Sequence, residues 1–210
     1  MKVGRRGIFV VFEGVDRSGK STQCRLLVES LAKAGRKAEV RRFPERSTAI
    51  GQLIDQYLKR EIELDDRAVH LLFSANRWEA ASTVRTTLAS GTDVVCDRYA
   101  YSGVAFSAAK ETILDVDWCK APDAGLPEPD LVVYLVLENA ETAEARGGYG
   151  SERYEETDMQ KRVAQNFKTL KGPQWQVVDA GRDIQAVHAD VEAIVHEAIA
   201  NLKPDVGSLW

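Results

Sequence analysis

The stretch Gly14-Val15-Asp16-Arg17-Ser18-Gly19-Lys20-Ser21-Thr22 decides the fold of this chain. It follows residues 8–12, an apolar run typical of a buried strand, and it leads into a helical period that starts at Gln23. The glycines allow the backbone to curl so that successive amides point at an anion, and the start of the helix adds a partial positive charge. In this context the pattern G-x-x-x-x-G-K-S/T predicts a phosphate-binding loop, or P-loop.

Two side chains of this loop have predicted contacts with a bound nucleotide. Lys20 would reach the β- and γ-phosphates, and the hydroxyl of Ser21 would bind Mg²⁺. Asp97 ends a later apolar run, and an aspartate in that position helps to hold Mg²⁺ in P-loop proteins. The sequence therefore predicts binding of a nucleoside triphosphate together with magnesium.

Length, charge and cysteine content limit the class of protein. The chain has 210 residues and a net charge of -4, with acidic and basic residues interspersed, so we expect one domain over residues 1–210 and no nucleic-acid partner. Cys24, Cys96 and Cys119 lack metal-like spacing and are expected to be reduced thiols. No apolar run approaches the ~20 residues that span a bilayer. We expect a cytoplasmic protein without a membrane partner, with the nucleus as the alternative location.

Predicted strands and helices alternate along the chain. The expected strands are residues 8–12, 37–43, 93–97, 131–137 and 176–179. The expected helices are residues 20–34, 49–60, 65–90 and 100–110, and a final helix that starts near residue 184. Residues 115–129 are expected to be irregular. This alternation predicts a three-layer α/β fold, an open five-stranded parallel sheet flanked by helices.

Residues 146–156 have the sequence Arg-Gly-Gly-Tyr-Gly-Ser-Glu-Arg-Tyr-Glu-Glu. Three glycines within four positions favour mobility, and five charged residues make the segment too polar to pack in a core. In a protein that handles phosphates, such a segment is interpreted as a short lid. A solvated loop is the alternative.

Arginines follow the ends of two predicted strands. Ligands of an open parallel sheet bind outside the carboxyl ends of its strands, so Arg46 and Arg98 should lie near Arg17 and Lys20. Four cations around one cavity exceed what one Mg²⁺-bound triphosphate requires, and a second phosphate group accounts for the surplus. For each arginine alone, a surface salt bridge is the alternative.

The chain also lacks the Asn-Lys-x-Asp guanine signature, which argues against a GTPase. The residues favour a kinase with a phosphorylated acceptor over a nucleotide-binding module that transfers nothing.

The long predicted helix carries Phe73 and Arg77 four residues apart, on one face. An aromatic ring beside a guanidinium could stack on a base and hydrogen-bond its edge. The alternative is a boundary pair with Phe73 in the core. Leu72, Ala75 and Trp78 are expected to face the core, and His70 is expected to be structural.

Five motifs, in this order, closely resemble thymidylate kinases of the eukaryotic type. They are residues 12–22, 43–48 (FPERST), 70–78 (HLLFSANRW), 97–106 (DRYAYSGVAF) and 152–155 (ERYE). The resemblance covers nearly the whole chain. It implies a P-loop NTPase fold, transfer of the γ-phosphoryl group of ATP to dTMP with Mg²⁺ as cofactor, and a homodimer. A kinase with a broader range of deoxynucleoside monophosphates is the neighbouring alternative.

The resemblance also implies roles for individual residues. ATP would contact the P-loop and the lid, through Gly14, Asp16, Arg17, Ser18, Gly19, Lys20, Ser21, Thr22 and Arg146. dTMP would contact Asp16, Phe43, Arg46, Phe73, Arg77, Arg98, Gly103, Phe106 and Tyr154. The implied catalytic residues are Arg17, Lys20, Asp97 and Arg98, and the implied metal ligands are Ser21, Asp97 and Glu155.

Within the implied dTMP site, each part of the nucleotide has its own partners. Asp16 would contact the sugar 3′-hydroxyl, and Arg46 and Arg98 would bind the acceptor phosphate. Phe73 would stack on thymine while Arg77 donates to its O4 atom. Phe106 and Tyr154 would close around the deoxyribose. On the donor side, Arg17 would stabilise the phosphoryl group in transfer.

Overall fold

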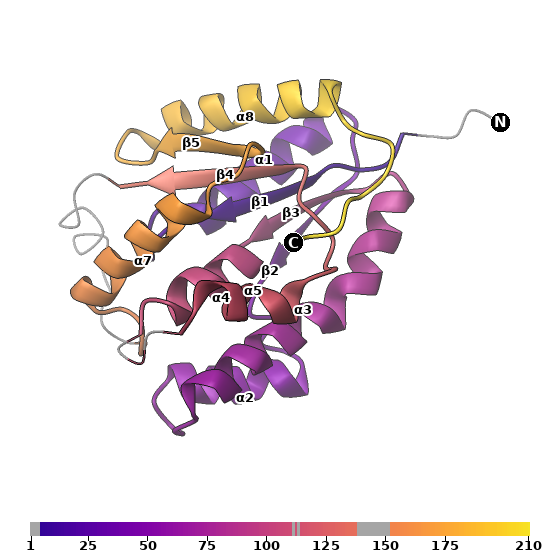
Figure 1. Ribbon diagram of the computed structural model, residues 1–210. Helices are drawn as coiled ribbons and strands as arrows, with labels where there is room; N and C mark the ends of the chain where they lie inside the picture. The colour runs from indigo at the N-terminus through magenta and orange to yellow at the C-terminus, as the bar shows by residue number, and fades with distance from the viewer. Residues whose placement is uncertain (1–4, 111, 113, 138–151) are drawn as a thin grey trace.

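The computed structural model describes residues 5–110, 112, 114–137 and 152–210. Helices lie on both faces of one sheet (Figure 1). The strands are β1 (Phe9–Glu13), β2 (Ala38–Arg42), β3 (Asp93–Asp97), β4 (Leu131–Val136) and β5 (Trp175–Asp179). The helices are α1 (Lys20–Lys33), α2 (Ala49–Leu58), α3 (Asp66–Ala89), α4 (Ala100–Ser107), α5 (Val116–Lys120), η1 (Ala121–Asp123, a 3-10 helix), α7 (Thr157–Leu170) and α8 (Ile184–Ala200).

The sheet is parallel throughout and has the strand order β2-β3-β1-β4-β5. β1 lies at its centre, where Phe9 pairs with Val94 of β3 and Val10 pairs with Leu131 of β4. Every residue of β1 and β3 is buried, as expected for strands that are covered on both faces. The predicted five-stranded parallel sheet flanked by helices is confirmed.

Two groups of helices cover the two faces of the sheet (Figure 1). On one face, α1 and α8 pack through residues such as Leu27 and Val191 against Val10 and Val133. On the other face, α3, α4 and α7 pack against strand residues that point the opposite way, such as Phe9 and Val11. α2 packs on α3 rather than on the sheet, through a small cluster of its own. α2 is therefore held to the sheet through α3.

The structure corrects three expectations from the sequence. The helix α7 was not predicted; it packs against α4. Residues 115–129 are not wholly irregular, because they contain α5 and η1. The side chain of Trp78 is 43% exposed, so the prediction that it faces the core is wrong. On this stretch of α3 the buried positions belong instead to the polar residues Ser74, Asn76 and Arg77.

Other expectations are met within the described residues. Cys24, Cys96 and Cys119 are free, as expected for reduced thiols, and all three are buried. His70 is wholly buried, and its ring nitrogens contact the hydroxyl of Ser107 at 2.7 Å and a backbone carbonyl at 2.9 Å, as expected for a structural histidine. Among the helices of these residues, none is both long and apolar enough to cross a bilayer.

Candidate active site

Two adjoining cavities open where the strands β1, β2 and β3 end. The P-loop cavity is bounded by the loop between β1 and α1, by Asp97 at the end of β3, and by the start of α8. The arginine cavity is bounded by Arg42, Arg46, Arg77 and Arg98, together with residues of α4 and with Glu152, Tyr154 and Glu155. Four residues line both cavities, namely Asp16, Arg42, Arg98 and Glu155.

The four predicted cations do not surround a single cavity. Arg17 and Lys20 line the P-loop cavity, Arg46 lines the arginine cavity, and Arg98 stands at the border. Arg42 was not predicted, although it also stands at this border. Its position as the last residue of β2 was the signal that could have found it.

The predicted site residues line two different cavities. All the residues expected at dTMP, from Asp16 to Tyr154, line the arginine cavity. Residues 16–22 of the P-loop and Asp97 line the P-loop cavity. Gly14 lies outside its wall but has a φ of +146°, and a side chain there would come within 2.6 Å of the carbonyl oxygen of Leu135. Arg146 lies outside the described residues.

Lys20 begins α1 and is 6% exposed. Its Nζ donates to the carbonyl oxygens of Gly14 at 3.1 Å and Val15 at 2.7 Å, and to the hydroxyl of Ser18 at 3.3 Å. Burial and the nearby charge of Arg98 lower the pKa of Lys20 to about 8. The ammonium group is therefore held among neutral acceptors, and an anion in the cavity would favour its charged form.

Ser21 and Asp97 meet at the base of the P-loop cavity, where the hydroxyl donates to Oδ2 of Asp97 at 2.5 Å. A hydroxyl and a carboxylate oxygen side by side suit Mg²⁺, which binds few protein ligands and takes the rest from water and phosphate. Glu155, the third predicted ligand, makes other contacts. Its Oε1 accepts from Nη2 of Arg17 at 3.1 Å, and its Oε2 accepts from the backbone N of Glu152 at 3.1 Å.

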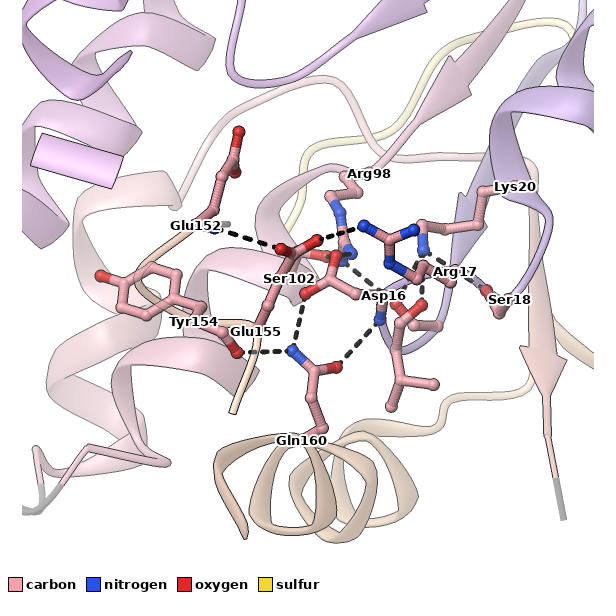
Figure 2. Close-up of polar contacts among 12 residues, drawn as sticks. Asp16, Arg17, Ser18, Lys20, Arg98, Ser102, Glu152, Tyr154, Glu155 and Gln160 are labelled. Carbon is pink, nitrogen blue, oxygen red and sulfur yellow. Dashed lines mark hydrogen bonds and ion pairs between the residues drawn. The ribbon is translucent and has the colours of Figure 1, made fainter. Parts of the chain in front are cut away.

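Asp16 connects the P-loop to Arg98, in the turn between β3 and α4, and to Gln160 of α7 (Figure 2). Its Oδ1 accepts from Nη2 of Arg98, and its Oδ2 accepts from Nε2 of Gln160 at 2.6 Å. The backbone N of Asp16 donates to Oε1 of the same glutamine at 2.9 Å. Burial acts to raise the pKa of Asp16, but the charges of Arg98 and Lys20 outweigh burial and lower it below its usual value. Asp16 is therefore a fixed carboxylate.

Gln160 is a site residue that the sequence did not reveal, because α7 was not predicted. Besides its two bonds to Asp16, its Nε2 donates to the carbonyl oxygen of Tyr154 at 2.8 Å (Figure 2). The ring of Tyr154 lies 5.6 Å from the ring of Phe106 and 6.1 Å from that of Tyr57. One amide group thus joins the P-loop to the aromatic wall of the arginine cavity.

The two arginines that were expected to bind phosphate, Arg46 and Arg98, form hydrogen bonds to carboxylates instead. Arg46 donates from Nη1 to Oδ1 of Asp55 at 2.5 Å and from Nη2 to both carboxylate oxygens of Glu152, at 2.8 and 3.1 Å. Its side chain is 34% exposed. Glu152 therefore competes with any anion that enters the arginine cavity.

The far end of the arginine cavity has the predicted pair Phe73 and Arg77. Arg77 is 2% exposed and pairs with Asp123, from Nε to Oδ1 at 3.1 Å and from Nη2 to Oδ2 at 2.7 Å. A side chain at Gly103 would come within 2.8 Å of Nη2 of Arg77, so a glycine is required for this approach. Asp123 was missed because it lies 46 residues from its partner. Phe73 is partly buried on the wall.

The chain is similar to known proteins in both sequence and fold. The family model for thymidylate kinase matches residues 12–191. The chain is 51% identical to the thymidylate kinase of Homo sapiens, over 98% of each chain, and 47% identical to that of Schizosaccharomyces pombe, over 93% of this chain and 94% of the relative. The solved structure of the Candida albicans thymidylate kinase superposes with a TM-score of 0.90 at 35% identity, over 99% of this chain and 100% of that one. The chain therefore belongs to the thymidylate kinase family, and it is an ATP-dependent phosphotransferase of that family.

Proposed function

We propose that the protein catalyses the reaction ATP + dTMP → ADP + dTDP with one substrate bound in each of the two cavities. ATP would occupy the P-loop cavity, and dTMP the arginine cavity. The observation that carries this assignment is the shared border of Asp16, Arg42, Arg98 and Glu155. Two phosphate-binding sites with a common wall place donor and acceptor phosphates head to head, which is the arrangement that in-line transfer needs.

Charge and position account for the chemistry without a general base. The second pKa of a phosphate monoester is about 6, so the acceptor is mostly an oxyanion at neutral pH. In this proposal Arg46 and Arg98 bind that oxyanion, and Lys20 and Arg17 bind and stabilise the phosphoryl group in transfer. Ser21 and Asp97 would hold Mg²⁺, which neutralises phosphate charge when it is bound.

The buried arginine supports selectivity for a base with a carbonyl at position 4. Asp123 occupies Nε and Nη2 of Arg77, which fixes the guanidinium beside the cavity as a hydrogen-bond donor. Cytosine presents an amino group at that position and would leave a donor facing a donor. The thymine methyl adds only about 0.8 kcal/mol of burial, so dUMP should be disfavoured only several-fold.

A broader acceptor range is the second candidate. The thymidylate kinase of Candida albicans, whose fold this chain shares, has a broad substrate specificity. Turnover measured with ATP and dTMP, dUMP, dCMP or AMP separates the two candidates. We expect dTMP to be preferred and dCMP to be turned over poorly, and comparable turnover of dCMP would contradict the role of Arg77.

Two substitutions test the division into donor and acceptor sides. Arg17→Gly should lower kcat by a larger factor than it raises the KM for dTMP, because Arg17 acts on the transferring group. Arg46→Ala should mainly raise the KM for dTMP. Arg25→Ala is the matched control, since Arg25 is an exposed arginine whose ion pair, among the described residues, is with Glu29 of the same helix. The reverse pattern for Arg17 and Arg46 would mean that the two sides are exchanged.

We further propose that residues 146–156 act as a lid on a single kinase domain formed by residues 1–210. The described part of this segment supports the proposal, because Glu152, Tyr154 and Glu155 line the arginine cavity. Arg153 fastens it to α2, with its backbone N donating to the carbonyl oxygen of Leu58 at 2.9 Å and its Nε to that of Tyr57 at 3.0 Å.

A homodimer is proposed from the family and from one exposed surface. Leu71 and Trp78 lie seven residues apart on α3, and thus on one face of that helix, with 47% and 43% of their surface exposed. An apolar pair on a long surface helix is a candidate contact between two copies of the chain.

A further inference from the structure

Glu13 is the last residue of β1 and has no exposed surface, and it lines neither cavity. Its Oε1 accepts hydrogen bonds from the backbone N of Tyr99 at 2.9 Å and of Ser102 at 3.1 Å. Its Oε2 accepts from the hydroxyl of Ser102 at 2.5 Å. The side chain of Tyr99, the N-cap residue, does not cap α4, so the carboxylate on β1 provides the cap instead.

The hydroxyl of Ser102 extends this contact to Arg98. A hydroxyl has one proton and two lone pairs, and the proton of Ser102 is directed at Glu13. Its oxygen is thereby left to accept from Nη1 of Arg98 at 3.0 Å. The same Nη1 donates to the carbonyl oxygen of Gly14 at 3.1 Å, and Nη2 donates to Asp16. Glu13 thus determines whether one of the three acceptors around Arg98 is available.

We propose that Glu13 and Ser102 are positioning residues for the phosphoryl transfer. Glu13 fixes the hydroxyl of Ser102 as an acceptor, and this hydroxyl holds the guanidinium of Arg98 at the border of the two cavities. The inference rests on the proposed function of Arg98 in binding the acceptor phosphate. Burial raises the pKa of Glu13, while the hydrogen bond from Ser102 and the charge of Arg98 oppose that rise, so these two groups favour the carboxylate form on which the arrangement depends.

Glutamine at position 13 would reverse the polarity of this contact with little change of size. Its amide oxygen must stay at the Oε1 position to accept from the two backbone N–H groups. Its amino group then donates to Ser102, and the hydroxyl proton turns toward Nη1 of Arg98, donor against donor. In Ser102→Ala the acceptor is lost, but Gly14 and Asp16 still hold Arg98. With both substitutions no hydroxyl is left to be reversed.

Steady-state kinetics and melting temperatures of the three variants test the proposal. We expect Glu13→Gln to lower kcat/KM for dTMP on the order of tenfold to a hundredfold, the range for a lost hydrogen bond to a charged group. Ser102→Ala should lower it less, and both should affect the KM for ATP less than that for dTMP. The double variant should be more active than Glu13→Gln alone, although no more stable.

The pair Ser30 and Glu192 provides the matched control. It is also a serine hydroxyl donating to a glutamate carboxylate, but it joins α1 to α8 and lines neither cavity. Ser30→Ala and Glu192→Gln should lower the melting temperature without changing dTMP kinetics.

Two results would overturn the inference. One is a Glu13→Gln enzyme with unchanged kcat/KM for dTMP well below its melting temperature, which would make Glu13 only a helix cap. The other is a double variant whose losses multiply. Arg98→Ala separates these results from a failure of the proposed function. If Arg98→Ala binds dTMP normally, the assignment of Arg98 itself is wrong. If Arg98→Ala binds dTMP weakly while either overturning result is seen, the assignment of Arg98 stands and only the positioning role of Glu13 and Ser102 is lost.

Discussion

Among the single residues of the site, Lys20 has a burial and a lowered pKa that link nucleotide binding to its protonation. Its ammonium group is buried against two loop carbonyls and one hydroxyl, and its pKa is lowered to about 8. Since burial and Arg98 disfavour the charged form, about half of the lysine is neutral at pH 8 without ligand. A triphosphate beside the ammonium group would stabilise its charge and raise its pKa again.

Binding of ATP should therefore take up protons in the range where the lysine is partly neutral. For a pKa of about 8, we expect uptake of roughly half a proton per site at pH 8 and about a tenth at pH 7. Isothermal titration of Mg²⁺-bound ATP in two buffers of different ionisation enthalpy measures this uptake at each pH. Uptake that is absent at pH 8, or equal at the two pH values, would contradict the lowered pKa of Lys20.

Glu152 and the acceptor phosphate should compete for Arg46. The carboxylate bonds Nη2 through both oxygens, but both side chains are about one-third exposed, so the pair contributes at most about 1 kcal/mol. We expect Glu152→Gln to lower the Kd of dTMP by up to about fivefold, measured by titration without ATP. Glu156→Gln is the control, because Glu156 pairs with Arg60 and lines neither cavity. Weaker binding of dTMP by Glu152→Gln would show that Glu152 assists the acceptor.

Site residues differ in how far the sequence could reveal them. The P-loop residues and the arginines at strand ends could be found, because their positions follow from the chain-local order of strand, turn and helix. Asp123 and Gln160 could not, since each acts through a partner that is distant in the sequence, Arg77 and Asp16 respectively. Glu13 lies within the first of the five motifs, but its contact with α4 depends on how the strands and helices assemble.

At the scale of elements, α7 contributes most to the site among those that the sequence did not predict. The 14 residues of α7 include three buried apolar residues four positions apart, Met159, Val163 and Phe167. They form only a narrow apolar stripe among polar residues, which is a weak helical signal in the sequence. The same face presents Gln160 to the P-loop. By contrast, the strands were predictable because each is an apolar run, and β1 and β3 are buried at every position.

The hydrogen bonds between Gln160 of α7 and Asp16 of the P-loop should strengthen the binding of dTMP. Gln160→Ala leaves Oδ2 and the backbone N of Asp16 without their glutamine partner. Hydrogen bonds to charged groups contribute about 1.5–3 kcal/mol, so we expect the KM for dTMP to rise roughly tenfold or more. Asn166→Ala removes an amide of the same helix that bonds the carbonyl oxygen of Ala105, and it should leave the KM unchanged. Equal effects of the two substitutions would reduce Gln160 to a packing residue.

At the scale of the whole molecule, the parallel sheet explains why distant motifs form one site. All five strands end at the same edge, so the residues after β1, β2 and β3 converge there although they are dozens of positions apart. The alternation of strands and helices was enough to predict a parallel sheet. It did not determine the strand order β2-β3-β1-β4-β5, which depends on packing between layers that no local pattern encodes.

The assembly of two chains can be tested on the exposed face of α3. Leu71→Glu places a charge on the apolar surface shared with Trp78, and a buried unpaired charge would oppose association. We expect sedimentation equilibrium to show a dimer for the native chain and a monomer for this variant. Within the described part of the chain, one copy supplies the residues that line the P-loop cavity and the arginine cavity, so we expect the monomer to retain turnover of dTMP. Val177→Glu is the control, because Val177 is 48% exposed on the edge strand β5, and this variant should stay dimeric. If Leu71→Glu also remained a dimer, the contact between copies would have to lie on another surface.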